Sequence, residues 1–288
     1  MAFYYAKAGP DSSLITIAGM PLDRTSSFAS GSRFGPALAR LGADNIESFS
    51  PYLGRDVAQV PVYDAGDLEF SYATADAPLA LIRQFTRAMI YRGRKLLALG
   101  GEHTITGPIV AELSSRYPDL CVVHYDAHSD LRDEYLGERV CHATAMARVL
   151  DSVPRDRLFQ LGIRSFAAAA EVRAPNVFAF DVLAPAAKIR AAIRTRPVYV
   201  TLDVDVLDPG VMPDVQTPQP GGCSYIELVR SLAALDGLNL VGADLVEVCP
   251  RTIQPSAGAC VAAELVRELV LLLAGSGERR KAKRRKRR

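Results

Sequence analysis

Short apolar segments alternate with segments of helical periodicity along almost the whole of this chain. The segments that read as strands are 14–18, 95–99, 120–125, 158–162, 177–180, 198–205 and 240–248. Several are apolar on both faces, which is typical of a parallel sheet covered by helices on each side. Strands alternating with helices predict βαβ units, so we expect an α/β fold of three layers, α/β/α, with a mostly parallel central sheet.

Three of the intervening helices have recognisable ends. Pro78 begins one whose apolar residues recur at helical spacing, and we expect it to end near Gly93. A capping box beginning at Ser224 predicts the start of another. The last helix is expected over 261–273, with Gly275 ending it.

The charges of the chain are unevenly distributed. Residues 279–288 hold nine of the 34 lysines and arginines and no acid, so the rest of the chain has a net charge of −7. We therefore expect one folded domain over 1–276, followed by a basic, disordered tail over 277–288. A tail of this kind could also attract RNA without regard to its sequence, or the acidic body of a neighbouring subunit.

Composition also indicates where such a chain works. No apolar run approaches the roughly 20 residues of a membrane helix, and the N-terminus lacks a basic segment followed by an apolar block. We therefore expect no membrane span, no secretory signal and a cytoplasmic location. The five cysteines form no CxxC pair, which favours reduced thiols over a disulfide framework or a thiolate zinc site.

A group of metal-ligating side chains follows the apolar run at 120–125. Asp126, His128 and Asp130 are spaced two residues apart, so in an extended segment they would all face the same way. Burying two carboxylates and an imidazole together is costly unless a cation lies between them. The spacing therefore predicts a metal site at this strand end.

Three more such residues are expected at the same edge of the sheet. His103 follows a Gly-Gly turn after the strand at 95–99, while Asp203 and Asp205 end the strand at 198–205. Each has an ordinary explanation alone, since a loop histidine often has no role and alternating acids often face water. Their co-occurrence is the informative feature, because open α/β sheets bind ligands at the carboxyl ends of their strands.

The combined set is larger than one catalytic ion needs. Two imidazoles and four carboxylates suit two ions that share carboxylates, and a thiolate-free set favours Mn²⁺ over structural Zn²⁺. Two such ions can hold a bridging water and lower its pKa towards ~7. The residues therefore predict metal-assisted hydrolysis.

Four segments, taken in order, resemble the ureohydrolase family of arginases and agmatinases. Residues 100–104, GGEHT, are similar to the family's GGDHS, and 126–130, DAHSD, to DAHxD. Residues 201–209, TLDVDVLDP, are similar to SxDxDxxDP, and 217–222 to the loop that follows. Weaker similarity at 31–36 and 160–164 extends the resemblance from about residue 17 to about residue 273, so 1–276 would be a single ureohydrolase catalytic domain.

The resemblance implies two Mn²⁺ ions per subunit with a hydroxide between them. The first ion would be held by His103, Asp126, Asp130 and Asp203. The second would be held by His128, Asp126, Asp203 and Asp205. Asp126 and Asp203 would then bridge the ions, and the hydroxide would attack the guanidinium carbon of the substrate.

Three catalytic roles follow from the same resemblance. Asp130 would orient the hydroxide, and His142 would carry protons to the leaving amine. Glu247 would pair with the substrate guanidinium in a planar, two-pronged contact. The alternatives are a histidine of no consequence at a helix start and an exposed acid at a strand end.

The segment after Asp130 bears on the substrate. Residues 131–139 carry three acids and resemble archaeal agmatinases, and an acidic rim would attract the ammonium end of agmatine. Those acids could instead pair with Arg132 and Arg139. We expect hydrolysis of agmatine to urea and putrescine, as in polyamine biosynthesis, with aminopropylagmatine, arginine and guanidinobutyrate as alternative substrates.

Three residues depart from the family pattern. Glu102 stands where an aspartate is usual, and because that residue is not a ligand in the family we expect a small effect. Gln216 stands where the family has a glycine, and its side chain is expected to narrow or repurpose the pocket. Gln219 stands where agmatinases often have a glutamate, so these loops put the choice of substrate in question.

Two further expectations concern partners. The resemblance implies a homo-oligomer, either a trimer or a hexamer, acting on a small guanidino compound. A rival of another class is a non-catalytic protein of the same fold that binds nucleic acid through its basic tail. The intact set of six ligands argues against that rival.

Overall fold

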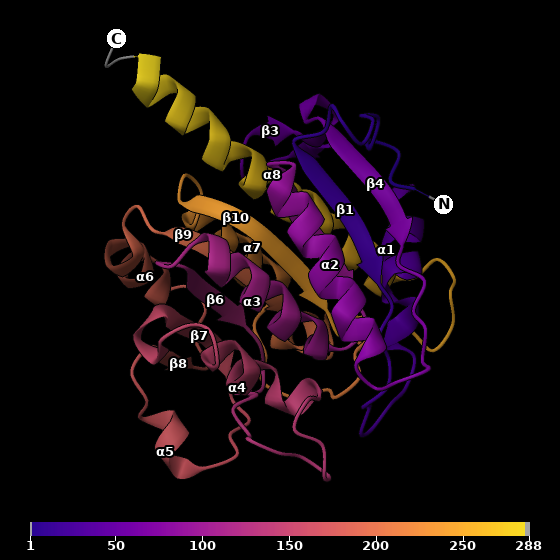
Figure 1. Ribbon diagram of the computed structural model, residues 1–288, viewed down its shortest axis with the longest axis vertical. Helices are drawn as coiled ribbons and strands as arrows, with labels where there is room; N and C mark the ends of the chain where they lie inside the picture. The colour runs from indigo at the N-terminus through magenta and orange to yellow at the C-terminus, as the bar shows by residue number, and fades with distance from the viewer. Residues whose placement is uncertain (1, 286–288) are drawn as a thin grey trace.

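Eight strands form one sheet in the computed structural model, which describes residues 2–285, with only the backbone described for Ala187 and 277–285 (Figure 1). The strands are β1 (Ile15–Met20), β4 (Val62–Asp67), β5 (Lys95–Gly100), β6 (Cys121–Tyr125), β7 (Leu158–Ile163), β8 (Val177–Ala179), β9 (Pro197–Asp203) and β10 (Asn239–Val246). Their order is β4-β1-β5-β10-β9-β6-β7-β8, and every neighbouring pair is parallel. The predicted parallel α/β sheet is therefore confirmed.

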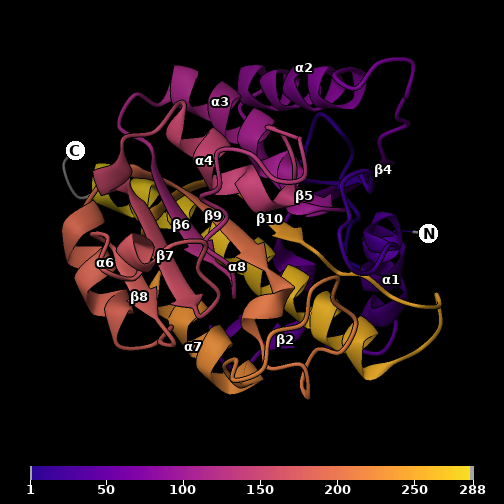
Figure 2. The same ribbon diagram turned by 90° about the horizontal axis from the view of Figure 1, so that it is seen from below.

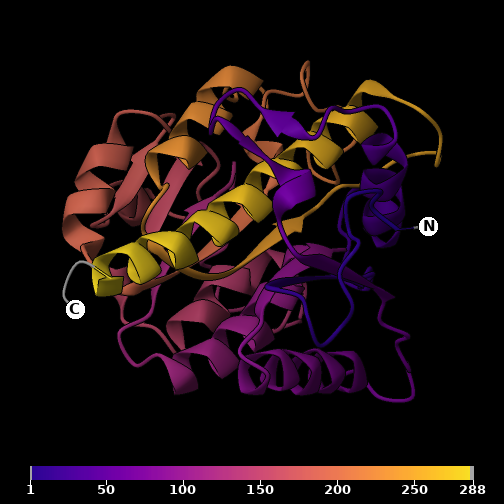
Figure 3. The same cartoon turned by 90° about the horizontal axis from the view of Figure 1, so that it is seen from above.

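Helices cover both faces of this sheet, as Figure 2 shows. One face carries α2 (Ala77–Tyr91), α3 (Thr106–Arg116) and α4 (Ala145–Leu150). The other carries α1 (Gly35–Ala43), α6 (Pro185–Ile193), α7 (Tyr225–Ala234) and α8 (Ala257–Arg285). Figure 3 shows α8 running across the molecule, with α1 near the beginning of α8 and α2 on the opposite side.

Smaller elements complete the chain. A short helix, α5 (Ala169–Val172), precedes β8, and β2 (Phe49–Ser50) pairs with β3 (Arg55–Asp56) in a separate antiparallel ribbon. Within the part of the chain that the structure describes, no helix is long and apolar enough to cross a membrane. All five cysteines are free.

The apolar strands divide their side chains between two cores. In β5, Leu97 and Leu99 belong to the core that α1, α7 and α8 share with the sheet. The alternate residues Leu96 and Ala98 belong to the core formed with α2, α3 and α4. Because successive side chains of a strand point to opposite faces, a strand buried on both sides has to be apolar throughout.

The end of one strand and the presence of another differ from the sequence expectations. The strand predicted over 198–205 ends at Asp203, where a 3₁₀ turn over Val204–Val206 begins. Strand β4 was not predicted, because its residues are mostly half-buried and include Asp64 and Gly66, which lack a strand pattern.

The predicted end of the last helix at Gly275 is wrong. Helix α8 begins at Ala257 and continues through Gly275 to Arg285. A side chain at Gly275 would clash with Arg55 and Asp236, so the glycine permits close packing there and does not end the helix. The division into a catalytic domain over 1–276 and a disordered tail over 277–288 stays a prediction.

Candidate metal centre and substrate cavity

The predicted site residues follow the four central strands of the sheet. Strands β5, β10, β9 and β6 are successive neighbours and all parallel, so their carboxyl ends meet at one edge. His103 follows β5, Glu247 follows β10, Asp203 ends β9 and Asp126 follows β6. The topology therefore brings together residues up to 144 positions apart in the sequence.

The two aspartate-rich segments converge through turns and not through strand alternation. Strand β6 ends at Tyr125, so Asp126, His128 and Asp130 lie in the loop beyond it. Asp130 has a φ of 53°, in the left-handed region, which aspartate enters more readily than most other residues do. Residues two apart on a straight strand would be about 6.6 Å apart, so the turn is what directs the side chains to one point.

The first half of the cluster surrounds His103. Its Nδ1 lies 3.1 Å from Asp126 Oδ2, 3.1 Å from Asp130 Oδ2 and 3.5 Å from Asp203 Oδ2. Its Nε2 lies 2.9 Å from Thr201 Oγ1, a hydrogen bond in which the ring N–H donates when Nδ1 is left as a lone pair. The ring is thus oriented with Nδ1 towards three carboxylates.

The second half of the cluster surrounds His128. Its Nδ1 lies 2.8 Å from Asp205 Oδ2 and 3.5 Å from Asp126 Oδ1. The other oxygen of Asp205 accepts a hydrogen bond of 2.9 Å from the backbone of Ala127. The two oxygens of Asp126 therefore face different halves, the arrangement that a bridging carboxylate needs.

The chemistry of this cluster fits a pair of cations. Burial and the neighbouring carboxylates of Asp205 and Asp126 raise the pKa of Asp203 well above its ordinary value. Burial lowers the pKa of His128, but Asp205 and Asp126 outweigh it and raise that pKa to about 12. Nδ1 of His103 and Oδ2 of Asp205 are buried without a hydrogen bond to any described residue. Positive charge between these nitrogen and oxygen atoms would satisfy them, and imidazole and carboxylate donors suit divalent metal ions.

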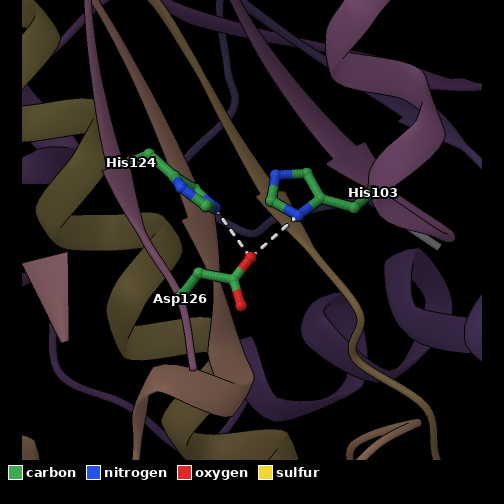
Figure 4. Close-up of side chains that lie close together, drawn as sticks. All are labelled: His103, His124 and Asp126. Carbon is green, nitrogen blue, oxygen red and sulfur yellow. Dashed lines mark hydrogen bonds and ion pairs between the residues drawn. The ribbon is translucent and has the colours of Figure 1, made fainter. Parts of the chain in front are cut away.

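His124 belongs to the cluster and was missed in the sequence. Figure 4 shows the rings of His124 and His103 side by side, both directed at the same oxygen of Asp126, and His124 Nε2 lies 2.7 Å from Asp126 Oδ2. The amide of Gln160 lies 3.1 Å from Nδ1 of His124 and, as donor, places the ring proton on Nε2. The available signal was an imidazole inside an otherwise apolar, fully buried strand. Its hydrogen bonds make it a support for Asp126.

His142 lies at the start of a 3₁₀ turn, next to the loop that carries Thr25 and Ser27. Its Nδ1 is 3.1 Å from Thr25 Oγ1, and its Nε2 is 3.1 Å from Ser27 Oγ. Glu102 holds this loop, because its Oε2 accepts from the backbone N–H groups of Arg24 and Thr25 at 2.9 and 2.7 Å. The glutamate that departs from the family pattern is therefore a buried loop anchor.

Gly101, which precedes Glu102, shows why the turn after β5 needs glycine. A side chain at Gly101 would lie 2.0 Å from the carbonyl oxygen of Leu22, which itself accepts a 2.8 Å hydrogen bond from the backbone of Glu102. Only glycine permits this close approach of two backbone segments.

Glu247 is buried beside the metal cluster in a strained conformation. Its φ is 63°, and its Oε1 accepts a 2.6 Å hydrogen bond from the backbone N–H of His103. Burial raises its pKa well above the ordinary value, although the N–H of His103 opposes this rise. A cationic ligand beside it would stabilise the ionised form.

A cavity opens onto these groups. At its base lie His128, Asp130, Asp203 and Glu247, with His142 beside them. Its remaining lining residues are Ser27, Ser129, Arg132, Tyr135, Ala143, Ser165, Phe166, Ala167 and Thr217. All three predicted catalytic residues therefore line the cavity that borders the cluster of histidines and aspartates.

The predicted acidic rim is wrong. Arg132 and Tyr135 are the residues of 131–139 that line the cavity, and the guanidinium of Arg132 lies 5.3 Å from the centre of the Tyr135 ring. Asp133 pairs with Arg139 and with Arg148. Glu138 makes a longer contact, 3.7 Å, with Arg24. Asp133 and Glu138 thus pair with arginines, as in the alternative explanation of this segment, and none of its three acids lines the cavity.

The expectation for Gln216 is also wrong. Its side chain is fully buried and does not line the cavity. It faces Glu247 and the loop that carries Ser26 and Ser27.

Comparison with known proteins agrees with this geometry. The model of the arginase family matches residues 13–272. A curated relative, the agmatinase of Bacillus anthracis, is 40% identical over 268 residues, which are 91% of this chain and 92% of the relative. The guanidinobutyrase of Pseudomonas aeruginosa is 30% identical, covering 89% of this chain and 85% of its own. The crystal structure of the agmatine ureohydrolase of Thermoplasma volcanium superposes with a TM-score of 0.85 at 28% identity, covering 96% of each chain.

Proposed function

The chain belongs to the arginase family and is a ureohydrolase, and we propose that it hydrolyses agmatine to urea and putrescine. The observation that carries this proposal is the convergence of two imidazoles and four carboxylates, with Asp126 between the two imidazoles, beside a cavity that Glu247 also lines. The similarity to agmatinases supports the choice of substrate.

The six ligands would bind two ions, one in the half of the cluster around His103 and one in the half around His128. Two Mn²⁺ ions bound there would supply a hydroxide nucleophile at neutral pH. One ion would be held by His103, Asp126, Asp130 and Asp203. The other would be held by His128, Asp126, Asp203 and Asp205.

The remaining steps fall to residues of the cavity. The ionised carboxylate of Glu247 binds the guanidinium and places its carbon over Asp203 and Asp130. Asp130 accepts a hydrogen bond from the nucleophile and keeps it oriented. His142, held by Thr25 and Ser27, delivers a proton to the amine as the C–N bond breaks, so that one water and agmatine become urea and putrescine.

Guanidinobutyrate is a second candidate, because one observation favours it. Arg132 is exposed at the cavity and is positively charged, so it would attract a carboxylate at the far end of the substrate and repel an ammonium group. The similarity to a guanidinobutyrase supports the same alternative.

A urea-release assay tests both candidates. The Mn²⁺-loaded protein is given agmatine, aminopropylagmatine, guanidinobutyrate and arginine, and kcat/KM is compared. The proposal expects the highest value for agmatine. No urea from agmatine or its aminopropyl derivative contradicts it, and a much higher value for guanidinobutyrate or arginine replaces agmatine as the substrate.

The same preparation tests the expected partners. We expect a homo-oligomer, a trimer or hexamer, working in the cytoplasm, and light scattering in solution measures its mass. RNA retention that is lost at high salt and on deletion of 279–288, without urea release from any compound, would favour the non-catalytic rival.

A further inference from the structure

Gln216 is held beside Glu247 by the pairing of two loops. An antiparallel bridge joins Val215 to Val248, and the backbone of Cys249 donates a 2.8 Å hydrogen bond to the carbonyl of Asp214. In this register the residue after Val215 lies next to the residue before Val248. The loop therefore delivers the Gln216 side chain to the back of Glu247, away from the cavity.

The amide of Gln216 completes the hydrogen bonding of that carboxylate. With its nitrogen turned towards Glu247, where both polar ends find complementary partners, Nε2 lies 2.7 Å from Oε2. The amide oxygen then accepts from Ser26 Oγ at 2.9 Å and from the Ser27 backbone at 3.2 Å. The other carboxylate oxygen already accepts from the backbone of His103. Each oxygen of Glu247 thus has one donor fixed by the fold.

The amide of Gln216 also connects Glu247, the proposed guanidinium partner, with the segment that contacts His142, the proposed proton carrier. Ser27, which donates to the Gln216 oxygen through its backbone, places its hydroxyl 3.1 Å from Nε2 of His142. Glu247 and His142 both line the cavity, whereas Gln216 does not. A planar guanidinium needs the plane of its carboxylate partner to be set in advance.

We propose that Gln216 is a positioning residue for substrate binding, which fixes the plane of the Glu247 carboxylate and ties it to the segment beside His142. This proposal deepens the proposed function and rests on it. It assigns Gln216 a part in recognising the guanidinium group without contact with the substrate.

The test is the Gln216→Met variant, which keeps the length of the side chain and removes both of its hydrogen-bonding groups. KM for agmatine is expected to rise about tenfold, because a hydrogen bond to a charged group is lost, while kcat falls less than KM rises. The inhibition constant of putrescine, which has no guanidinium, is expected to stay within about twofold of the wild-type value. Equal weakening of agmatine and putrescine would show general damage and overturn the proposal.

Gln219→Met is the matched control. Gln219 lies on the same loop and is half-buried, and its side chain makes no hydrogen bond with any residue that the structure describes. This variant is expected to behave as wild type. Thermal melting is compared for all variants, and Gln216→Leu, whose side chain is shorter and also lacks both hydrogen-bonding groups, replaces the methionine variant if that one does not fold.

Binding of guanidinium ion, measured by calorimetry on the Mn²⁺-loaded proteins, separates the two proposals. If agmatine is not hydrolysed but Gln216→Met binds guanidinium about tenfold more weakly than wild type does, the proposed substrate fails and the role of Gln216 stands. If agmatine is hydrolysed, and the KM for agmatine and the affinity for guanidinium ion are both unchanged in Gln216→Met, the proposed function stands and the role of Gln216 is overturned.

Discussion

The base of the cavity and its mouth are built in different ways. At the base, the side chains come from the ends of four adjacent parallel strands, and their neighbours are buried. At the mouth, Arg132 and Tyr135 come from an exposed loop in which Asp133 and Glu138 pair with arginines. The base has little freedom to change, because each carboxylate is held by a backbone or imidazole contact, while residues at the mouth can be exchanged at small cost.

The largest effect is expected at the base, from Asp126→Asn. The amide loses the negative charge that both halves of the cluster share, so both ions should bind at least a hundredfold more weakly and turnover should be abolished. Metal content by plasma spectrometry and urea release measure this. An active variant with full metal content would contradict the bridging role.

A smaller effect is expected from His124→Phe, because His124 contacts the proposed ligand Asp126 and is not itself among the six proposed ligands. The phenyl ring fills the same space but cannot donate to Asp126, so Mn²⁺ affinity should fall about 10–100-fold. Competition with a fluorescent chelator measures the affinity. A variant with wild-type affinity but reduced thermal stability would mean that His124 only packs.

At the mouth, Arg132→Glu is expected to change selectivity and leave the metals in place. The ratio of kcat/KM for agmatine to that for guanidinobutyrate should rise about tenfold or more, because a charge that repels ammonium becomes one that attracts it. Arg139→Glu, on the same segment but absent from the cavity lining, is the control. An unchanged ratio would place substrate selection elsewhere.

The smallest effect is expected far from the cavity, at the start of α7. Ser224 caps this helix by accepting from the backbone of Glu227, and Glu227 accepts in return from the Ser224 backbone at 2.8 Å. Ser224→Ala should cost about 1 kcal/mol in the free energy of unfolding without changing kcat.

The pH dependence of that cost has a definite sign. The backbone and hydroxyl of Ser224 hold the pKa of Glu227 below its ordinary value. The stabilisation from Glu227 is therefore present above the ordinary glutamate pKa and is lost as pH falls through the lowered one. Urea denaturation at neutral and acid pH measures both effects. A cost that does not shrink in acid would contradict the reciprocal cap.

The sequence predicted the residues at the base of the cavity much better than those at its mouth. The six predicted metal ligands lie in one cluster, and three of them, His128, Asp130 and Asp203, line the same cavity as His142 and Glu247. Strand ends in a parallel sheet converge, which is why ligands that follow different strands could be expected at one place. His142 and Glu247 were assigned from the resemblance to the ureohydrolase family. The expectations of an acidic rim at 131–139 and of Gln216 in the pocket were wrong, because Arg24 and Arg148, which pair with two of the acids, and Glu247, which faces Gln216, lie on other segments.

By itself, then, the sequence determined the layered α/β fold, the edge of the sheet that carries the site and the kinds of ligand found there. These depend on local periodicity and on the alternation of strands and helices. Tertiary structure alone decided which arginines neutralise the rim, that His124 supports Asp126, and that Gln216 faces Glu247 and not the substrate. Such contacts depend on how distant loops pack, and a loop's own residues do not specify the segment that it will meet.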